Sequence, residues 1–171
     1  MKVIEIKSLS VYTFGLYVHP DSICEKLGRK YAFVPVNELN NRPDFYEDLL
    51  MEDIHMTARI VVNYNGLKIN TVRNAFEKSL RARLLKMNPN TNYYFLRTFG
   101  SYFAQDISLF VGTSIYFCQT VDGKLITEIN EKYIGVVHSK KFSKAFFEMY
   151  IGDGPVSMQA KEEIVRTLMV S

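Results

Sequence analysis

The side chains that could serve as a base, a nucleophile or a metal ligand are few and scattered along this 171-residue chain. Its three histidines, His19, His55 and His138, are not spaced as two ligands on one helix face would be. No serine or cysteine near them belongs to a motif that activates a nucleophile. We therefore expect no metal site, no cofactor and no catalytic histidine, and we predict that each histidine is a sheet or strand-end residue.

The remaining reactive groups favour structural roles. Cys24 and Cys118 match no CxxC or zinc-binding spacing, so we expect free thiols, with Cys118 packed as a small apolar residue and a disulfide as the open alternative. Acidic residues gather at positions 47–53, which is typical of the solvated side of a short helix. The GDGP sequence at 152–155 lacks the Lys-Ser/Thr pair of a phosphate-binding loop and predicts a turn.

Composition sets the broad class. Hydrophobic residues make up 47% of the chain, which is enough for one core, and we predict a single domain over residues 1–171. The net charge of +3 is weak and dispersed, so nucleic acid is not an expected partner. No apolar stretch approaches the roughly 20 residues of a membrane span, and the N-terminal residues do not form a signal or transit peptide. We expect a soluble protein.

Apolar periodicity predicts an α+β order, with a mostly antiparallel sheet and helices packed on one face. Asn70 or Thr71 is expected to cap the longest helix, and Ser139 the helix whose apolar face carries Phe146, Met149 and Tyr150. Strands are predicted over residues 3–18, 54–64, 113–120, 124–129 and 132–137, and helices over 21–26, 44–51, 70–86, 92–103, 139–150 and 157–169.

Four segments carry a resemblance to a known family. FSKAFFEMYIGDGPVSMQAKEEI at 142–164 closely resembles the C-terminal signature of the chalcone isomerase-like family, in which a helix ends at a Gly-Asp/Glu turn before a capped helix. VYTFGLYV at 11–18, YNGLKINTVRNAFEKSL at 64–80 and GTSIYFCQTVDGKLI at 112–126 support it. The resemblance implies an open-faced β-sandwich, an antiparallel sheet packed against a layer of helices.

That family contains isomerases, which close chalcones to flavanones, and plant fatty-acid binders without catalysis. In the isomerases a threonine, a tyrosine, an asparagine and a threonine or serine surround the substrate, and the resemblance places these positions at Tyr12, Thr71, Lys78 and Met149. None of the four is the isomerase residue. A missing phenol and the bulk of Met149 would remove polar stabilisation and space, so no catalytic residue is expected.

The resemblance to the fatty-acid binders implies that Tyr12 holds a ligand carboxylate together with an arginine, because a buried carboxylate needs donors or a cation. The family arginine would fall just ahead of Met1, so we expect one or two N-terminal strands to be lacking. Arg59 or Arg73 is the candidate replacement, and a surface ion pair is the alternative for each. The expected pocket residues, with plain core packing as their alternative, are Thr71, Phe76, Leu80, Phe146 and Met149.

The resemblance therefore implies a non-catalytic fatty-acid-binding protein of the plastid stroma, which holds a fatty acid or a similar apolar carboxylate for fatty-acid metabolism or storage. Two alternatives remain open. One is a chalcone-flavanone isomerase. The other is a non-catalytic helper protein of flavonoid synthesis, for which an exposed apolar patch would bind a pathway enzyme.

Overall fold

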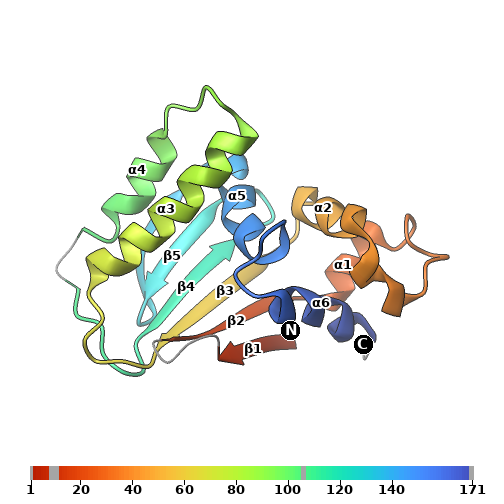
Figure 1. Cartoon of the computed structure of the whole chain (residues 1–171), viewed down its shortest axis with the longest axis horizontal. Helices are drawn as coiled ribbons and strands as arrows, with labels where there is room; N and C mark the ends of the chain where they lie inside the picture. Colours follow the sequence, from red (N-terminus) through yellow and green to blue (C-terminus); the bar gives the residue numbers. More distant parts are fainter. Residues whose placement is uncertain (1, 8–11, 105–106, 170–171) are drawn as a thin grey trace.

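The computed structural model describes residues 2–7, 12–104 and 107–169. Within them, six antiparallel strands form one sheet in the order β1-β2-β3-β4-β5-β6. Helices α3 and α5 lie against one face of this sheet, and α1, α2 and α6 gather at one end (Figure 1). The elements are β1 (Lys2–Lys7), β2 (Tyr12–Val18), α1 (Pro20–Leu27), the 3-10 helix η1 (Val36–Asn41), α2 (Pro43–Met51), β3 (Met56–Val62), α3 (Ile69–Met87), α4 (Tyr94–Ser101), β4 (Ser114–Gln119), β5 (Leu125–Ile129), β6 (Lys132–Val137), α5 (Lys140–Ile151) and α6 (Met158–Met169).

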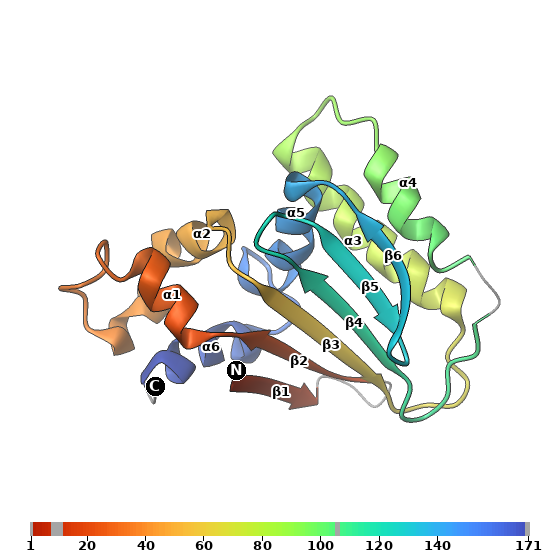
Figure 2. The ribbon, with the colours of Figure 1, turned by 180° about the vertical axis from the view of Figure 1, so that it is seen from behind.

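Alternating burial gives the sheet two different faces. In β3 every second residue is buried and the residues between are half-buried, as expected for a strand whose one face packs against helices. Ala58 and Ile60 face the helices, so Arg59 between them faces the other way. Figure 2 shows this second face, with the strands in front of the helices. The predicted α+β class with helices on one face is confirmed.

The prediction of one strand over residues 3–18 is wrong. The structure has two antiparallel strands, β1 and β2, in which Ile6 lies opposite Phe14. The connection at residues 8–11 lies outside the described residues. Apolar and polar residues alternate in both strands and neither glycine nor proline stands between them, so the sequence carries no signal for the reversal.

Of the two predicted helix caps, one is confirmed by the structure and the other is wrong. Ser139 caps α5 as predicted, because its Oγ accepts a hydrogen bond from the Phe142 backbone N–H at 3.1 Å. The predicted cap of α3 is wrong, since Lys68 occupies that position without a side-chain cap. Asn70 and Thr71 lie inside the first turn instead, one or two residues past the start of the helix.

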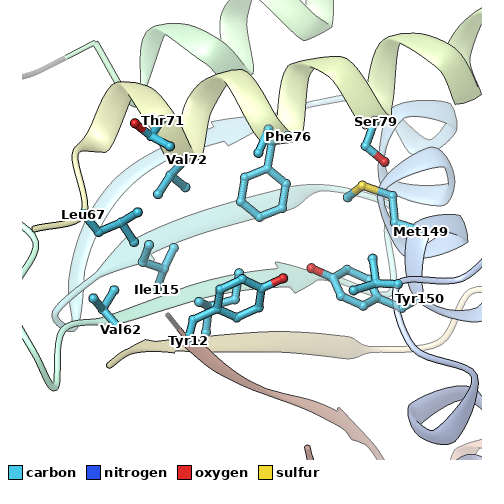
Figure 3. A pocket seen from close by; sticks show the side chains of 13 residues that line it. Tyr12, Val62, Leu67, Thr71, Val72, Phe76, Ser79, Ile115, Met149 and Tyr150 are labelled. Atoms are coloured by element: carbon cyan, nitrogen blue, oxygen red, sulfur yellow. The ribbon is translucent and has the colours of Figure 1, made fainter. Parts of the chain in front are cut away.

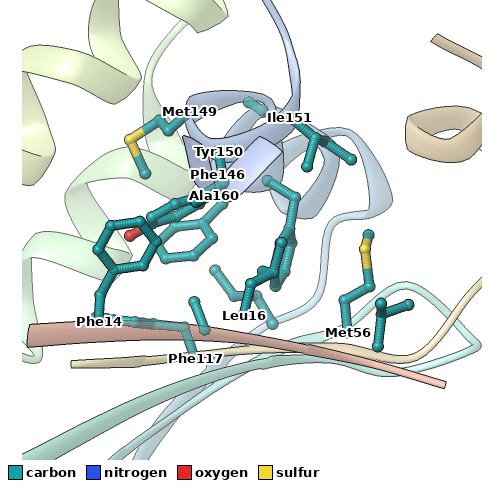
Figure 4. Close-up of a cluster of buried hydrophobic side chains, with 14 of the residues drawn as sticks. Phe14, Leu16, Met56, Phe117, Phe146, Met149, Tyr150, Ile151 and Ala160 are labelled. Carbon is teal, nitrogen blue, oxygen red and sulfur yellow. The ribbon is translucent and has the colours of Figure 1, made fainter. Parts of the chain in front are cut away.

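Aromatic rings fill the space between the sheet and α3, α4 and α5. Phe117 of β4 lies beneath Phe146 of α5, with ring centroids 4.8 Å apart (Figure 4). The ring of Phe76, on α3, lies 5.0 Å from that of Phe117. Phe117 and Phe146 are fully buried. Tilted and edge-on ring pairs at such distances contribute beyond the apolar area they bury, so this cluster sets how α3 and α5 sit on the sheet.

We expect Phe146→Ala to lower the free energy of unfolding by about 3–5 kcal/mol, because it removes a buried ring and leaves a cavity among its neighbours. Urea denaturation measures this change. Phe110→Ala is the control, since the Phe110 side chain is 59% exposed, and it is expected to change the free energy by less than about 0.5 kcal/mol. Equal changes in both variants would show that the aromatic cluster does not determine stability.

Candidate ligand-binding cavity

A cavity of about 300 Å³ lies between α3 and the helix-facing side of β2, β3 and β4 (Figure 3). Its floor includes Ile60, Val62 and Ile115, and its roof includes Val72 and Phe76. The last turn of α5 and the loop between α5 and α6 close one end. The volume is at the lower limit of small-molecule sites in proteins, and the walls are almost entirely apolar.

The sequence of α3 explains the space beneath it. Among the 19 residues of this helix only Leu80 is fully buried, and its other apolar residues that pack against the core are only partly buried. Ala75 and Ser79 are small, and they flank Phe76, whose ring reaches down to the aromatic cluster. The middle of α3 therefore packs on the core through Phe76, and the small side chains of Ala75 and Ser79 leave space between the helix and the sheet.

Three hydroxyl groups face this apolar space, from Tyr12, Ser79 and Tyr150, whereas the Thr71 hydroxyl is directed away from it (Figure 3). Figure 3 shows the Tyr12 and Tyr150 rings directed toward each other with their hydroxyls adjacent. Burial raises the pKa of Tyr150, and the nearby phenol of Tyr12 raises it further, so the Tyr150 hydroxyl stays a neutral donor. Among the described residues, no charged side chain lines the cavity.

Arg83, on α3, stands behind Ser79. Its Nη1 donates to Ser79 Oγ at 3.4 Å, and its Nη2 donates to the Gly154 carbonyl at 3.0 Å. In the same loop the Val156 N–H donates to the Met149 carbonyl at 2.7 Å. One guanidinium thus fixes both a cavity hydroxyl and the loop that closes the cavity.

Four of the predicted site residues meet at the cavity, namely Tyr12, Thr71, Phe76 and Met149. The predicted pocket residues Leu80 and Phe146 do not line it. Both are fully buried in the core, where Phe146 stacks on Phe76 at 5.8 Å. Both residues thus have the plain core-packing role that was the alternative to lining a pocket. Phe76 lies between Phe146 and the cavity.

Neither predicted arginine reaches the cavity. Strand alternation places Arg59 on the opposite face of the sheet, where its Nη1 donates to the Tyr17 hydroxyl at 3.3 Å. Arg73 is rotated by about 100° around the helix from Val72 and borders a separate depression near Phe103. The structure therefore corrects the prediction that either one is positioned to neutralise a carboxylate beside Tyr12.

Sequence reasoning missed Ser79, Tyr150 and Arg83. A signal existed for Tyr150, since it lies on an otherwise apolar helix face where a buried phenol needs a partner for its hydroxyl. Ser79 also falls on the sheet-facing side of α3. Nothing in the local sequence links Arg83 to Gly154, which is 71 positions further along the chain.

Neither cysteine lines the cavity. Both cysteines are free, as predicted, and Cys118 is half-buried with its Sγ 3.1 Å from His55 Nε2. Burial raises the pKa of the Cys118 thiol, which disfavours the nucleophilic thiolate. In the part of the chain that the structure describes, no three potential metal ligands cluster and no helix has the length and apolarity to cross a membrane.

Comparisons with known proteins agree on one family. The sequence model described as "Chalcone isomerase like" matches residues 1–165. Fatty-acid-binding protein 2 of Arabidopsis thaliana is 62% identical over 169 residues, which cover 99% of this chain and 42% of that protein. Fatty-acid-binding protein 1 of the same plant is 31% identical over 160 residues, or 94% of this chain and 57% of the relative. The chain thus spans about half the length of these two relatives.

Two further likenesses extend the comparison. Chalcone isomerase-like protein 1 of Humulus lupulus is 26% identical over 156 residues, which cover 91% of this chain and 71% of that protein. The crystal structure of a fatty-acid binding protein from Arabidopsis thaliana superimposes with a TM-score of 0.84 at 31% identity, over 92% of this chain and 78% of the other. This structural match confirms the predicted open-faced fold.

We expect Arg83→Met to loosen the loop at residues 152–157, because it removes the donors to Ser79 Oγ and the Gly154 carbonyl. Hydrogen exchange measured by mass spectrometry should show faster exchange at this loop, with a loss of roughly 1–2 kcal/mol in the free energy of unfolding. Arg73→Met on the same helix is the control and should leave the loop unchanged. If the Arg83 variant exchanges like the control, Arg83 does not hold the loop.

Proposed function

The chain belongs to the chalcone isomerase-like family, and on that premise we propose that it binds a fatty acid in the cavity beneath α3 without transforming it. The observation that carries this proposal is the cavity itself, an apolar space under α3 with phenol hydroxyls at one end. Two Arabidopsis relatives that are named fatty-acid-binding proteins support it.

The cavity has the two properties that an acyl chain and its head group need. Each methylene group moved from water into an apolar wall contributes about 0.8 kcal/mol, so the chain provides most of the affinity. The side chains of Val62, Val72 and Ile115 supply such a wall. The head group needs hydrogen-bond donors, and the hydroxyls of Tyr12 and Tyr150 face the same space.

The positions that correspond to the isomerase residues support binding without catalysis. Lys78 is exposed on α3 and lies outside the cavity, beside Arg81 and Tyr93. Met149 occupies cavity space where the isomerases carry a small hydroxyl residue. In addition, no histidine, cysteine or carboxylate of the described residues lines the cavity, so a general base for deprotonating a chalcone hydroxyl is not in place.

We place this function in fatty-acid metabolism or storage in the plastid stroma, as the family resemblance implies. A chalcone-flavanone isomerase is the runner-up, and a non-catalytic helper protein of flavonoid synthesis is the third candidate. The helper role would use exposed apolar side chains such as Met51 and Tyr94, which border a groove between α4 and α5. Both alternatives are outcomes of the experiment below.

A denatured solvent extract of the purified protein, analysed by mass spectrometry, tests the proposal. We expect stoichiometric fatty acid, and none from an unrelated protein of similar size. An empty extract, followed by failure to bind added dodecanoate, would contradict fatty-acid binding. Conversion of added chalcone to flavanone would establish the enzyme, and its absence in a protein that binds no fatty acid would leave the helper role.

We expect Ala75→Phe to lower the affinity for dodecanoate by tenfold or more, which corresponds to at least about 1.4 kcal/mol, because Ala75 lines the cavity and a ring at this position would occupy ligand space. Displacement of a fluorescent fatty acid measures the affinity. Ala82→Phe is the matched control, because Ala82 is an exposed alanine of the same helix beside a separate depression. Equal losses in both variants would mean that the ligand does not occupy this cavity.

A further inference from the structure

Tyr150 has an unusual position for a phenol. It is only 4% exposed, and its ring packs against Phe14 at 5.4 Å and Phe146 at 5.7 Å. Its hydroxyl faces the cavity (Figure 3). It makes no hydrogen bond to another side chain or backbone group of the described residues. The hydroxyl borders the open space of the cavity, so its O–H is available to an acceptor placed there.

Tyr12 lies across the cavity from the Tyr150 hydroxyl. Its hydroxyl is adjacent to that of Tyr150 in Figure 3, and the two phenols interact electrostatically. They do not hydrogen-bond to each other within the described chain. Each therefore keeps an O–H that can donate to an oxygen atom placed between them, and one carboxyl oxygen or a pair of them fits this arrangement.

Ser79 adds a third donor at the same end of the cavity. Its Oγ accepts from the Arg83 guanidinium at 3.4 Å, so the Ser79 proton remains available for an acceptor inside the cavity. The positive charge of Arg83 behind this hydroxyl favours a negative or strongly polar group in front of it. The other end of the cavity, near Leu67 and Val72, is apolar.

We propose that Tyr150 is the inner donor for the ligand's free carboxyl group, which lies between the Tyr150 and Tyr12 hydroxyls while the acyl chain extends beneath α3 toward Leu67 and Val72. This inference rests on the proposed function and deepens it. An acid whose carboxyl is esterified to coenzyme A or glycerol would have to place that group between the two phenols, and a cavity of about 300 Å³ cannot hold both it and the acyl chain. The site therefore selects free fatty acids over their coenzyme A thioesters and glycerol esters.

Tyr150→Phe separates a binding role from a structural one. The substitution keeps the ring that packs on Phe14 and Phe146 and removes only the hydroxyl. We expect the affinity for dodecanoate, measured by isothermal titration calorimetry on the whole chain, to fall about tenfold. The melting temperature of the ligand-free protein should stay the same, because the ring packing is kept and no hydrogen bond to another described residue is lost. A structural role would instead lower the melting temperature.

A double-mutant cycle tests whether the two phenols bind one group. Tyr12→Phe and Tyr150→Phe should each weaken binding, and the double variant should lose less than the product of the two single losses, because one carboxyl loses its shared donors. Tyr133→Phe, at a side chain 62% exposed on β6, is the control and should bind as the unaltered protein does.

The outcomes distinguish this inference from the proposed function. If the unaltered protein binds dodecanoate and Tyr150→Phe binds it equally well, the inference is overturned and fatty-acid binding stands. If dodecanoyl coenzyme A binds as tightly as dodecanoate, the claim that the free carboxyl group lies between the two phenols is also contradicted. If the unaltered protein does not bind dodecanoate at all, both the proposed function and the inference fail.

Discussion

The position of α3 over the sheet depends on how the ring of Phe76 packs beneath it. Phe76 lies edge-on to Phe117 of β4 at 5.0 Å and stacks on Phe146 of α5 at 5.8 Å, so the middle of the helix rests on the aromatic cluster. The small residues Ala75 and Ser79 flank this contact and leave the cavity on one side of it. Core packing and ligand binding thus depend on the same side chain, since close-packed interiors cannot absorb a shift of the helix.

The polar groups at the cavity differ in what they contribute to the empty protein. Tyr150 places a hydroxyl in an apolar environment where burial raises its pKa, and Arg83 reaches across to the Gly154 carbonyl to fix the neighbouring loop. Groups that are unfavourable without a ligand often mark functional sites, because selection retains them for binding and other contacts offset their cost. Here the rings of Phe14 and Phe146 around Tyr150 provide that compensation.

Local patterns predicted most elements but only part of the site. Strand β6 and the Ser139 cap follow directly from alternation and capping chemistry, and four cavity residues were anticipated through the family resemblance. The side of Arg59 was also implicit in the alternation of β3, since its neighbours are apolar. Whether Leu80 or Phe146 lines a pocket could not be predicted, because this depends on how elements far apart in the chain pack together.

The central claim is that a fatty acid occupies the cavity beneath α3. Nuclear Overhauser effects between bound dodecanoate and ¹³C-labelled methionine methyl groups test it directly, because Met149 lines that cavity while Met56 is buried in the core. The account predicts contacts from the acyl chain to the Met149 methyl and none to Met56. Contacts to Met51 and Met87, which border the groove between α4 and α5, would place the ligand elsewhere and contradict it.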